Sequence, residues 1–180
     1  MTGGELANLG GPSRPLTLLE SARVLGGLRW VELEAFKMLG AFAVSPPGSG
    51  FGPGSGPGPE ITQWASGSSL AHAWRATQLE ELLPVSAGLP GAAECTTSPG
   101  LAAGQWLATL RAGLVGVDAG AAESVPEHYG QLAAAYELRA SNAHASADGP
   151  VLRTLERLSG DVRSIAREYL RVGGTMVREA

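Results

Sequence analysis

Two side chains of this 180-residue chain could do chemistry in positions where helices normally bury apolar groups. Glu32 occurs in the apolar stretch GLRWVELEAFKMLG. At about 100° per residue it falls near the centre of the face formed by neighbouring Leu and Phe side chains. His72 falls within the apolar face of a second helical stretch, LAHAWRATQLEELLP. A carboxylate and an imidazole inside a helical core are typical of a metal site or of a buried ion pair.

The first hypothesis for these residues is a polar network made only of protein side chains. A buried Glu or His must be paired or bound to a metal, because an unpaired buried charge costs several kcal/mol. Arg29 lies toward the same side of its helix as Glu32, and Arg75 flanks His72. If the two helices are neighbours, the sequence predicts one buried network of Glu32, His72, Arg29 and Arg75 without a bound cofactor.

The alternative hypothesis is a metal site with Glu32 and His72 as ligands. The only plausible third ligand is Glu137, at the edge of the apolar face of a later helix. Carboxylate and imidazole ligands of this kind suit iron or manganese. Three such ligands are too few to hold two metal ions, so this hypothesis predicts a single ion.

Four long helical patterns and one short one must position these residues. The apolar periodicity predicts long helices over 15–44, 60–83, about 125–146 and about 149–172, and a short crossover helix over 99–116. We expect Pro126 in the first turn of its helix, where its missing N–H costs nothing, and the last helix to stop at Gly173 and Gly174. No strand pattern competes, so the predicted fold class is all-α.

The chain is predicted to form a single domain, because 180 residues with 44% hydrophobic content suffice for one core. Residues 1–14 are predicted to be a flexible N-terminal lead-in, 15–175 one helical bundle and 176–180 a C-terminal tail. Within the bundle, the Gly/Pro-rich segment 46–59 is predicted to be a flexible loop. Such a composition cannot bury enough apolar area to offset the entropy of ordering it.

The motifs RWVELEAF and LAHAWRATQLEELLP resemble the first and second helices of the ferritin-like superfamily, with Glu32 and His72 at ligand positions. The chain is also similar, over roughly residues 15–172, to a loosely defined group of uncharacterised ferritin-like proteins from GC-rich bacteria. The resemblance implies an antiparallel four-helix bundle with a crossover between the second and third helices. It also implies a di-metal site built from inward Glu residues and Glu-x-x-His motifs.

The di-metal motif is degenerate in this chain. Glu-x-x-His on the second helix requires Glu where Ser69 stands, and the last helix has Ser159 where the other His belongs. The sequence therefore predicts a non-catalytic ferritin-like bundle that acts as an interaction or assembly module. The alternative is a metal-dependent oxidase or oxygenase with a reduced site at Glu32 and His72. A third option is a binder of a small ligand in the polar core.

Composition and surface residues indicate the partners and the setting. A net charge of −4 without a basic stripe argues against nucleic-acid binding, and no apolar stretch is long enough to span a membrane. The single cysteine, Cys95, has no metal-ligand spacing around it and is expected to be a reduced thiol in the cytoplasm. Leu70 and Trp74 lie on the otherwise polar side of their helix. They predict contact with the crossover helix or with a second subunit, and a homodimer is the preferred assembly.

Overall fold

The computed structural model describes residues 11, 14–44, 59–115, 119–143 and 148–176, and within these ranges the chain is all-α, as the sequence predicts. The long helices are α2 (Leu18–Val44), α3 (Pro59–Glu81), α6 (Ala119–Ser141) and α7 (Gly149–Met176). The shorter helices are α4 (Ala92–Cys95) and α5 (Leu101–Val115). Among the described residues, no helix has the length and apolar content needed to cross a membrane.

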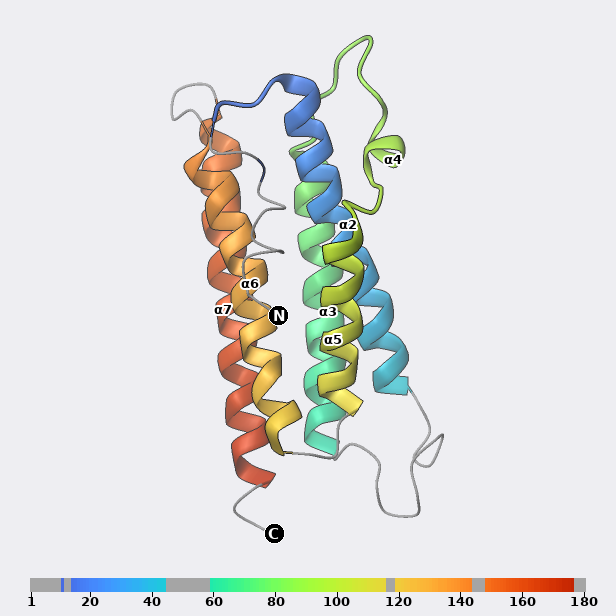
Figure 1. Cartoon of the computed structure of the whole chain (residues 1–180), viewed down its shortest axis with the longest axis vertical. Coiled ribbons are helices and arrows are strands. Elements are labelled where there is room, and N and C mark those ends of the chain that lie inside the picture. Colours follow the sequence, from blue (N-terminus) through green and yellow to red (C-terminus); the bar gives the residue numbers. More distant parts are fainter. Residues whose placement is uncertain (1–10, 12–13, 45–58, 116–118, 144–147, 177–180) are drawn as a thin grey trace.

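The long helices form two antiparallel hairpins that lie side by side (Figure 1). Helix α2 pairs with α3, α6 pairs with α7, and the hairpins meet where α3 packs against α7. The chain passes from the first hairpin to the second through α4 and α5. Helix α5 packs against both α2 and α6, and so it covers one side of the junction between the hairpins.

The core lies between the hairpins and under α5. Its largest fully buried apolar side chains come from five helices: Leu25, Leu28, Leu39, Leu79, Leu110, Leu132, Leu155 and Leu158. Trp106 of α5 is also buried, and its indole N–H donates to the backbone carbonyl of His128 in α6 at 2.9 Å. That bond satisfies the polar atom of a buried indole and fixes α5 against α6.

The start of α2 is fixed by a capping box. The backbone N–H of Thr17 donates to the Glu20 carboxylate at 2.9 Å, and the backbone N–H of Glu20 donates to the Thr17 hydroxyl at 3.3 Å. These two bonds satisfy donors that the first turn of a helix leaves free. Arg14, in the predicted lead-in, forms an ion pair with the same carboxylate at 2.5 Å.

The boundaries of the last two helices differ from the prediction. Helix α6 begins at Ala119 and ends at Ser141 rather than at about 146, so Pro126 lies inside the helix rather than in its first turn. An interior proline removes its own hydrogen bond and crowds the carbonyl four residues before it, but the residues upstream of it can still be helical. Helix α7 continues through Gly173 and Gly174 to Met176, because a glycine permits a left-handed stop without requiring one.

Most of the predicted flexible segments lie outside the described residues. Of the loop 46–59 only Pro59 is described, and it begins α3. Of the tail 176–180 only Met176 is described, and it ends α7.

Two glycines of α2 let the connection after α3 pack closely against the bundle. A Cβ on Gly26 would lie 2.2 Å from the carbonyl oxygen of Cys95, and one on Gly27 would lie 2.9 Å from Cβ of Pro99. Only glycine fits at such distances. The thiol of Cys95 is buried and forms no disulfide.

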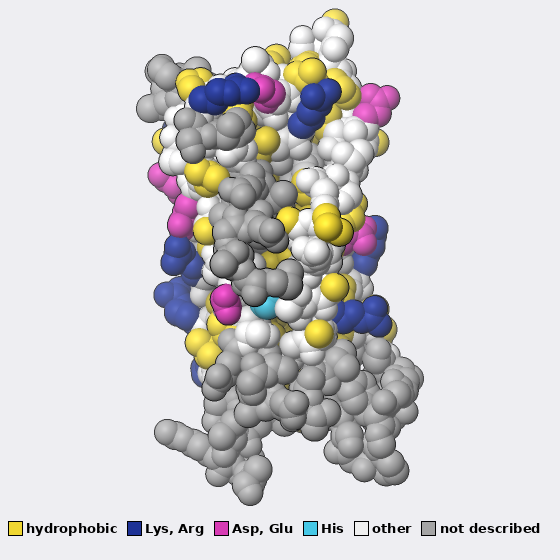
Figure 2. All heavy atoms as spheres, in the orientation of Figure 1, with side chains coloured by type: hydrophobic (Ala, Val, Ile, Leu, Met, Phe, Trp, Pro, Cys, Tyr) yellow, Lys and Arg dark blue, Asp and Glu magenta, His cyan; other side chains and the backbone are white. Residues whose placement is uncertain are grey.

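Charged side chains of both signs lie near one another on the surface. On the face shown in Figure 2, the Lys and Arg side chains lie close to Asp and Glu side chains and form no continuous basic patch.

Candidate functional site

Glu32 is the centre of a fully buried polar network between α2, α3 and α6. It lies on the same face of α2 as Leu25, Leu28 and Leu39, and its side chain has no exposed surface. One carboxylate oxygen, Oε2, lies 2.5 Å from Nδ1 of His72. The other, Oε1, accepts a bond from Nε of Arg75 at 2.9 Å and a second bond from the hydroxyl of Tyr136. Both oxygens of Glu32 therefore have protein partners.

His72 and Arg75 reach Glu32 because they are three residues apart on α3 and so share one face of that helix. Both are fully buried. The second ring nitrogen of His72, Nε2, lies 3.1 Å from the hydroxyl of Tyr129. Since the carboxylate of Glu32 can only accept, Nδ1 of His72 carries the proton and Nε2 accepts the proton of Tyr129.

Tyr129 and Tyr136 extend the network onto α6. They are seven residues apart, which is close to two helical turns, so both project from the same face of α6. Neither has exposed surface. Burial raises the pKa of both hydroxyls, and the nearby Glu32 raises it further, so both tyrosines remain protonated donors at neutral pH.

The network contains a carboxylate and a guanidinium that hold each other ionised. Burial by itself would raise the pKa of Glu32, but the charge of Arg75 and the bonds from His72 and Arg75 outweigh it and lower that pKa to about 2. Burial also opposes the charge of Arg75, but Glu32 outweighs it and raises the pKa of Arg75 above its usual value. Burial lowers the pKa of His72 against the pull of Glu32, and Arg75 lowers it further. His72 is therefore neutral at pH 7.

The arrangement joins three helices through side chains that are out of reach of solvent. No atom of its five side chains, Glu32, His72, Arg75, Tyr129 and Tyr136, reaches solvent. A metal ion would have to displace the protein partners of both oxygens of Glu32 and of both nitrogens of His72, next to a guanidinium cation. The terminal nitrogens of Arg75 have no hydrogen-bond partner within the described part of the chain.

The structure brings together three of the four residues predicted for the network, and the prediction for Arg29 is wrong. The guanidinium of Arg29 donates to Glu80 at 2.7 Å and to the hydroxyl of Thr96 at 2.6 Å, at the rim of the bundle. Arg29 lies one turn before Glu32, and its long side chain reaches outward. A partly exposed pairing with Glu80 avoids the cost of burying a second cation beside Arg75.

Glu137, the third ligand of the metal hypothesis, is also outside the network. Its carboxylate accepts bonds from Ser159 at 2.7 Å and from Arg163 at 2.6 Å, on the side of α6 that faces α7. The Ser159 and Arg163 bonds lower the pKa of Glu137 despite partial burial. Glu137 follows Tyr136 directly, so it points about 100° away from the network. Within the described residues, no three His, Cys, Asp or Glu side chains gather as a metal site would require.

The tyrosines are the network members that sequence reasoning missed. Tyr129 and Tyr136 are not among the residues predicted for the network, yet in the structure their hydroxyls bond to His72 and Glu32. The seven-residue spacing of the two tyrosines is the sequence signal that could have placed them in the network. Two inward hydroxyls two turns apart, opposite an inward Glu and His, need partners because a buried unpaired hydroxyl is costly.

Comparison with known proteins adds no relative: no protein-family model, no curated protein sequence and no solved structure matches this chain.

Proposed function

We propose that the protein is a non-catalytic helical bundle of the ferritin-like type that acts as an interaction or assembly module by forming a homodimer. The helix order supports the architecture. Two antiparallel hairpins joined by one long crossover, with α5 running along the bundle, is the connectivity that ferritin-like bundles use. The buried network supports the non-catalytic part, because both oxygens of Glu32 and both nitrogens of His72 are used for bonds between helices.

The observation that carries the proposal is the exposure of two large apolar residues on the outer side of α3. Leu70 is 68% exposed and Trp74, one turn further on, is 41% exposed. The crossover helix does not cover them, since α5 packs on α2 and α6. The guanidinium of Arg157 lies over the ring of Trp74 at 4.9 Å and covers part of it. Leu70 is left as the apolar centre of this face.

The surface around Leu70 extends onto the end of α2. A shallow groove of about 720 Å³ runs beside Leu70, and it is lined by Val44 and Pro59 among others. Val44 is 81% exposed. A second copy of the chain, placed with the same surface against this one, would bury these side chains in a symmetric contact.

Sedimentation velocity on the wild-type chain and on Leu70→Glu tests the dimer. We expect the wild type to be dimeric at tens of micromolar. Because a symmetric interface uses each residue twice, losing two buried Leu side chains costs about 3 kcal/mol or more, which weakens dimerisation roughly a hundredfold. The matched control is Leu101→Glu, since Leu101 is 78% exposed on α5. A monomeric wild type, or an equal effect of Leu101→Glu, would remove the proposal.

Elemental analysis of the purified protein tests the alternative, a metal-dependent oxidase or oxygenase with a reduced site at Glu32 and His72. One metal ion per chain that is lost in both Glu32→Ala and His72→Ala would favour that enzyme over the interaction module. Two iron or manganese ions per chain would overturn the non-catalytic proposal outright.

A cytoplasmic setting is part of the proposal, and it fits the unpaired thiol of Cys95.

A further inference from the structure

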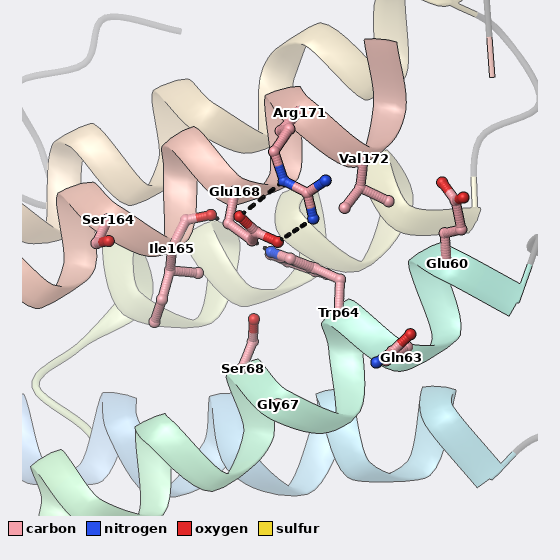
Figure 3. Close-up of a pocket in the computed structure, with 10 residues that line it drawn as sticks. All are labelled: Glu60, Gln63, Trp64, Gly67, Ser68, Ser164, Ile165, Glu168, Arg171 and Val172. Atoms are coloured by element: carbon pink, nitrogen blue, oxygen red, sulfur yellow. Dashed lines mark hydrogen bonds and ion pairs between the residues drawn. The ribbon is translucent and has the colours of Figure 1, made fainter. Parts of the chain in front are cut away.

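A groove of about 650 Å³ opens between α3 and α7, away from the buried network (Figure 3). Small residues leave the space: Gly67 and Ser68 on α3, and Ser164 on α7. None of the five network side chains lines this groove. Its volume lies within the range of small-molecule sites, roughly 300–1,000 Å³.

The groove contains a serine hydroxyl that the protein does not use. Ser68 is only 5% exposed, and its hydroxyl points into the groove (Figure 3). Within the described part of the chain this hydroxyl has no hydrogen-bond partner, although the indole N–H of the neighbouring Trp64 donates to the backbone carbonyl of Ile165. The Ser68 hydroxyl is not among the fully buried side-chain atoms that lack a partner, so water still reaches it, and a ligand that hydrogen-bonds to Ser68 replaces that water.

The charges around the groove favour a cation. Glu168 forms a two-bond ion pair with Arg171, at 2.5 and 3.1 Å. Glu60 adds a second carboxylate, which interacts electrostatically with Arg171. Two carboxylates and one guanidinium leave the lining with one negative charge in excess. Trp64 forms one wall, and the face of an indole attracts cations as well as apolar groups.

We propose that this groove binds a small organic cation, an ammonium group on a compact apolar body. The ammonium lies near the carboxylate of Glu60. The apolar body packs against Trp64 and Val172, which is buried at the end of the groove. Ser68 accepts or donates a hydrogen bond at the deep end.

Nuclear magnetic resonance titration with three matched probes tests the charge preference. The probes are phenethylamine, 2-phenylethanol and 3-phenylpropionate, which share a benzene ring and differ in charge. The readout is the indole N–H resonance of Trp64, assigned with Trp64→Phe. We expect the amine to shift this resonance saturably and the alcohol to bind roughly fivefold more weakly, because an exposed ion pair contributes up to about 1 kcal/mol. The carboxylate should bind more weakly than the alcohol.

Three variants test the location. Gly67→Leu places a side chain in the groove, and Gly130→Leu is its matched control on α6; at both glycines an added Cβ meets open space, so both variants should fold. Gly67→Leu should abolish the saturable shift, and Gly130→Leu should leave it unchanged. Glu60→Gln should weaken amine binding roughly fivefold and leave alcohol binding unchanged, because only the charge is lost.

The proposal has three outcomes that overturn it. They are no saturable shift with the amine, an undiminished shift in Gly67→Leu, and carboxylate binding as tight as amine binding.

Discussion

Replacing Glu32 with alanine should strongly destabilise the protein, because one carboxylate holds donors from two other helices. The substitution strands the Nδ1 proton of His72, the Nε proton of Arg75 and the hydroxyl of Tyr136, all without solvent access. Its largest consequence is a buried guanidinium with no counter-charge. Removing one partner of a buried ion pair typically costs 3–5 kcal/mol, so we expect a loss of about 4 kcal/mol.

Glu32→Gln should cost less, at about 2–3 kcal/mol, because the shape is kept and one oxygen can still accept from Arg75 and Tyr136. The amide nitrogen would face Nδ1 of His72, which is a donor in the native tautomer. His72 can adapt by moving its proton to Nε2 and donating to Tyr129 instead. The charge of Arg75 stays unpaired in both variants, so neither should be neutral.

Urea unfolding followed by far-ultraviolet circular dichroism measures these effects at pH 7.5. For a chain of this size a loss of about 4 kcal/mol corresponds to a fall in melting temperature of roughly 8–16 °C. The matched control is Glu34→Ala on the same helix, which removes a partly exposed ion pair with Lys37 and should cost less than about 0.5 kcal/mol. A cooperative Glu32→Ala protein within about 1 kcal/mol of the wild type would refute a buried, paired Glu32.

Three further predictions follow from the same contacts. Because the pKa of His72 is lowered by folding, its contribution to stability is complete above the unfolded pKa of 6.5 and is lost as the pH falls toward the folded pKa. The free energy of unfolding, measured between pH 8 and pH 5, should show this loss, and His72→Gln should make that pH dependence weaker. Gly26→Ala should lower the free energy of unfolding by about 1–3 kcal/mol, because the added Cβ meets the carbonyl oxygen of Cys95. Its control, Gly160→Ala, meets open space and should leave that free energy unchanged or raise it, as measured by chemical denaturation of both variants. Arg29→Ala should cost about 1 kcal/mol or less in the same assay, since its ion pair lies at the rim, and a cost similar to that of Glu32→Ala would return Arg29 to the buried network.

Helical phase is the part of the site that the sequence predicts well. Glu32 and His72 are placed inside by their positions among neighbouring apolar residues, and both are fully buried. Periodicity suffices here because a residue at the centre of an apolar face points inward for any rotation of the helix that buries that face. The sequence pairs Glu32 with His72 only on the condition that their helices are neighbours, and the structure meets that condition, because α2 packs against α3.

Residues at the edge of a helix face are where the sequence is least informative. Arg29 and Arg75 both lie near an inward ionisable residue, so the helical pattern predicts either arginine equally well as the ion-pair partner of Glu32. A long Arg side chain can turn inward or outward. The choice depends on what the neighbouring helix and loop offer, and for Arg29 they offer Glu80 and Thr96. Those two residues are far from Arg29 in sequence, so no local pattern links them.

The sequence by itself determined the long helices and the inward direction of Glu32 and His72, because these follow from local hydrogen bonding and from burying the apolar face of each helix. The tertiary structure alone decided the membership of the network. The axial register between α2, α3 and α6 sets whether Tyr136 reaches Glu32 and whether Tyr129 reaches His72. That register comes from packing among side chains distant in sequence, which a single-helix pattern does not contain.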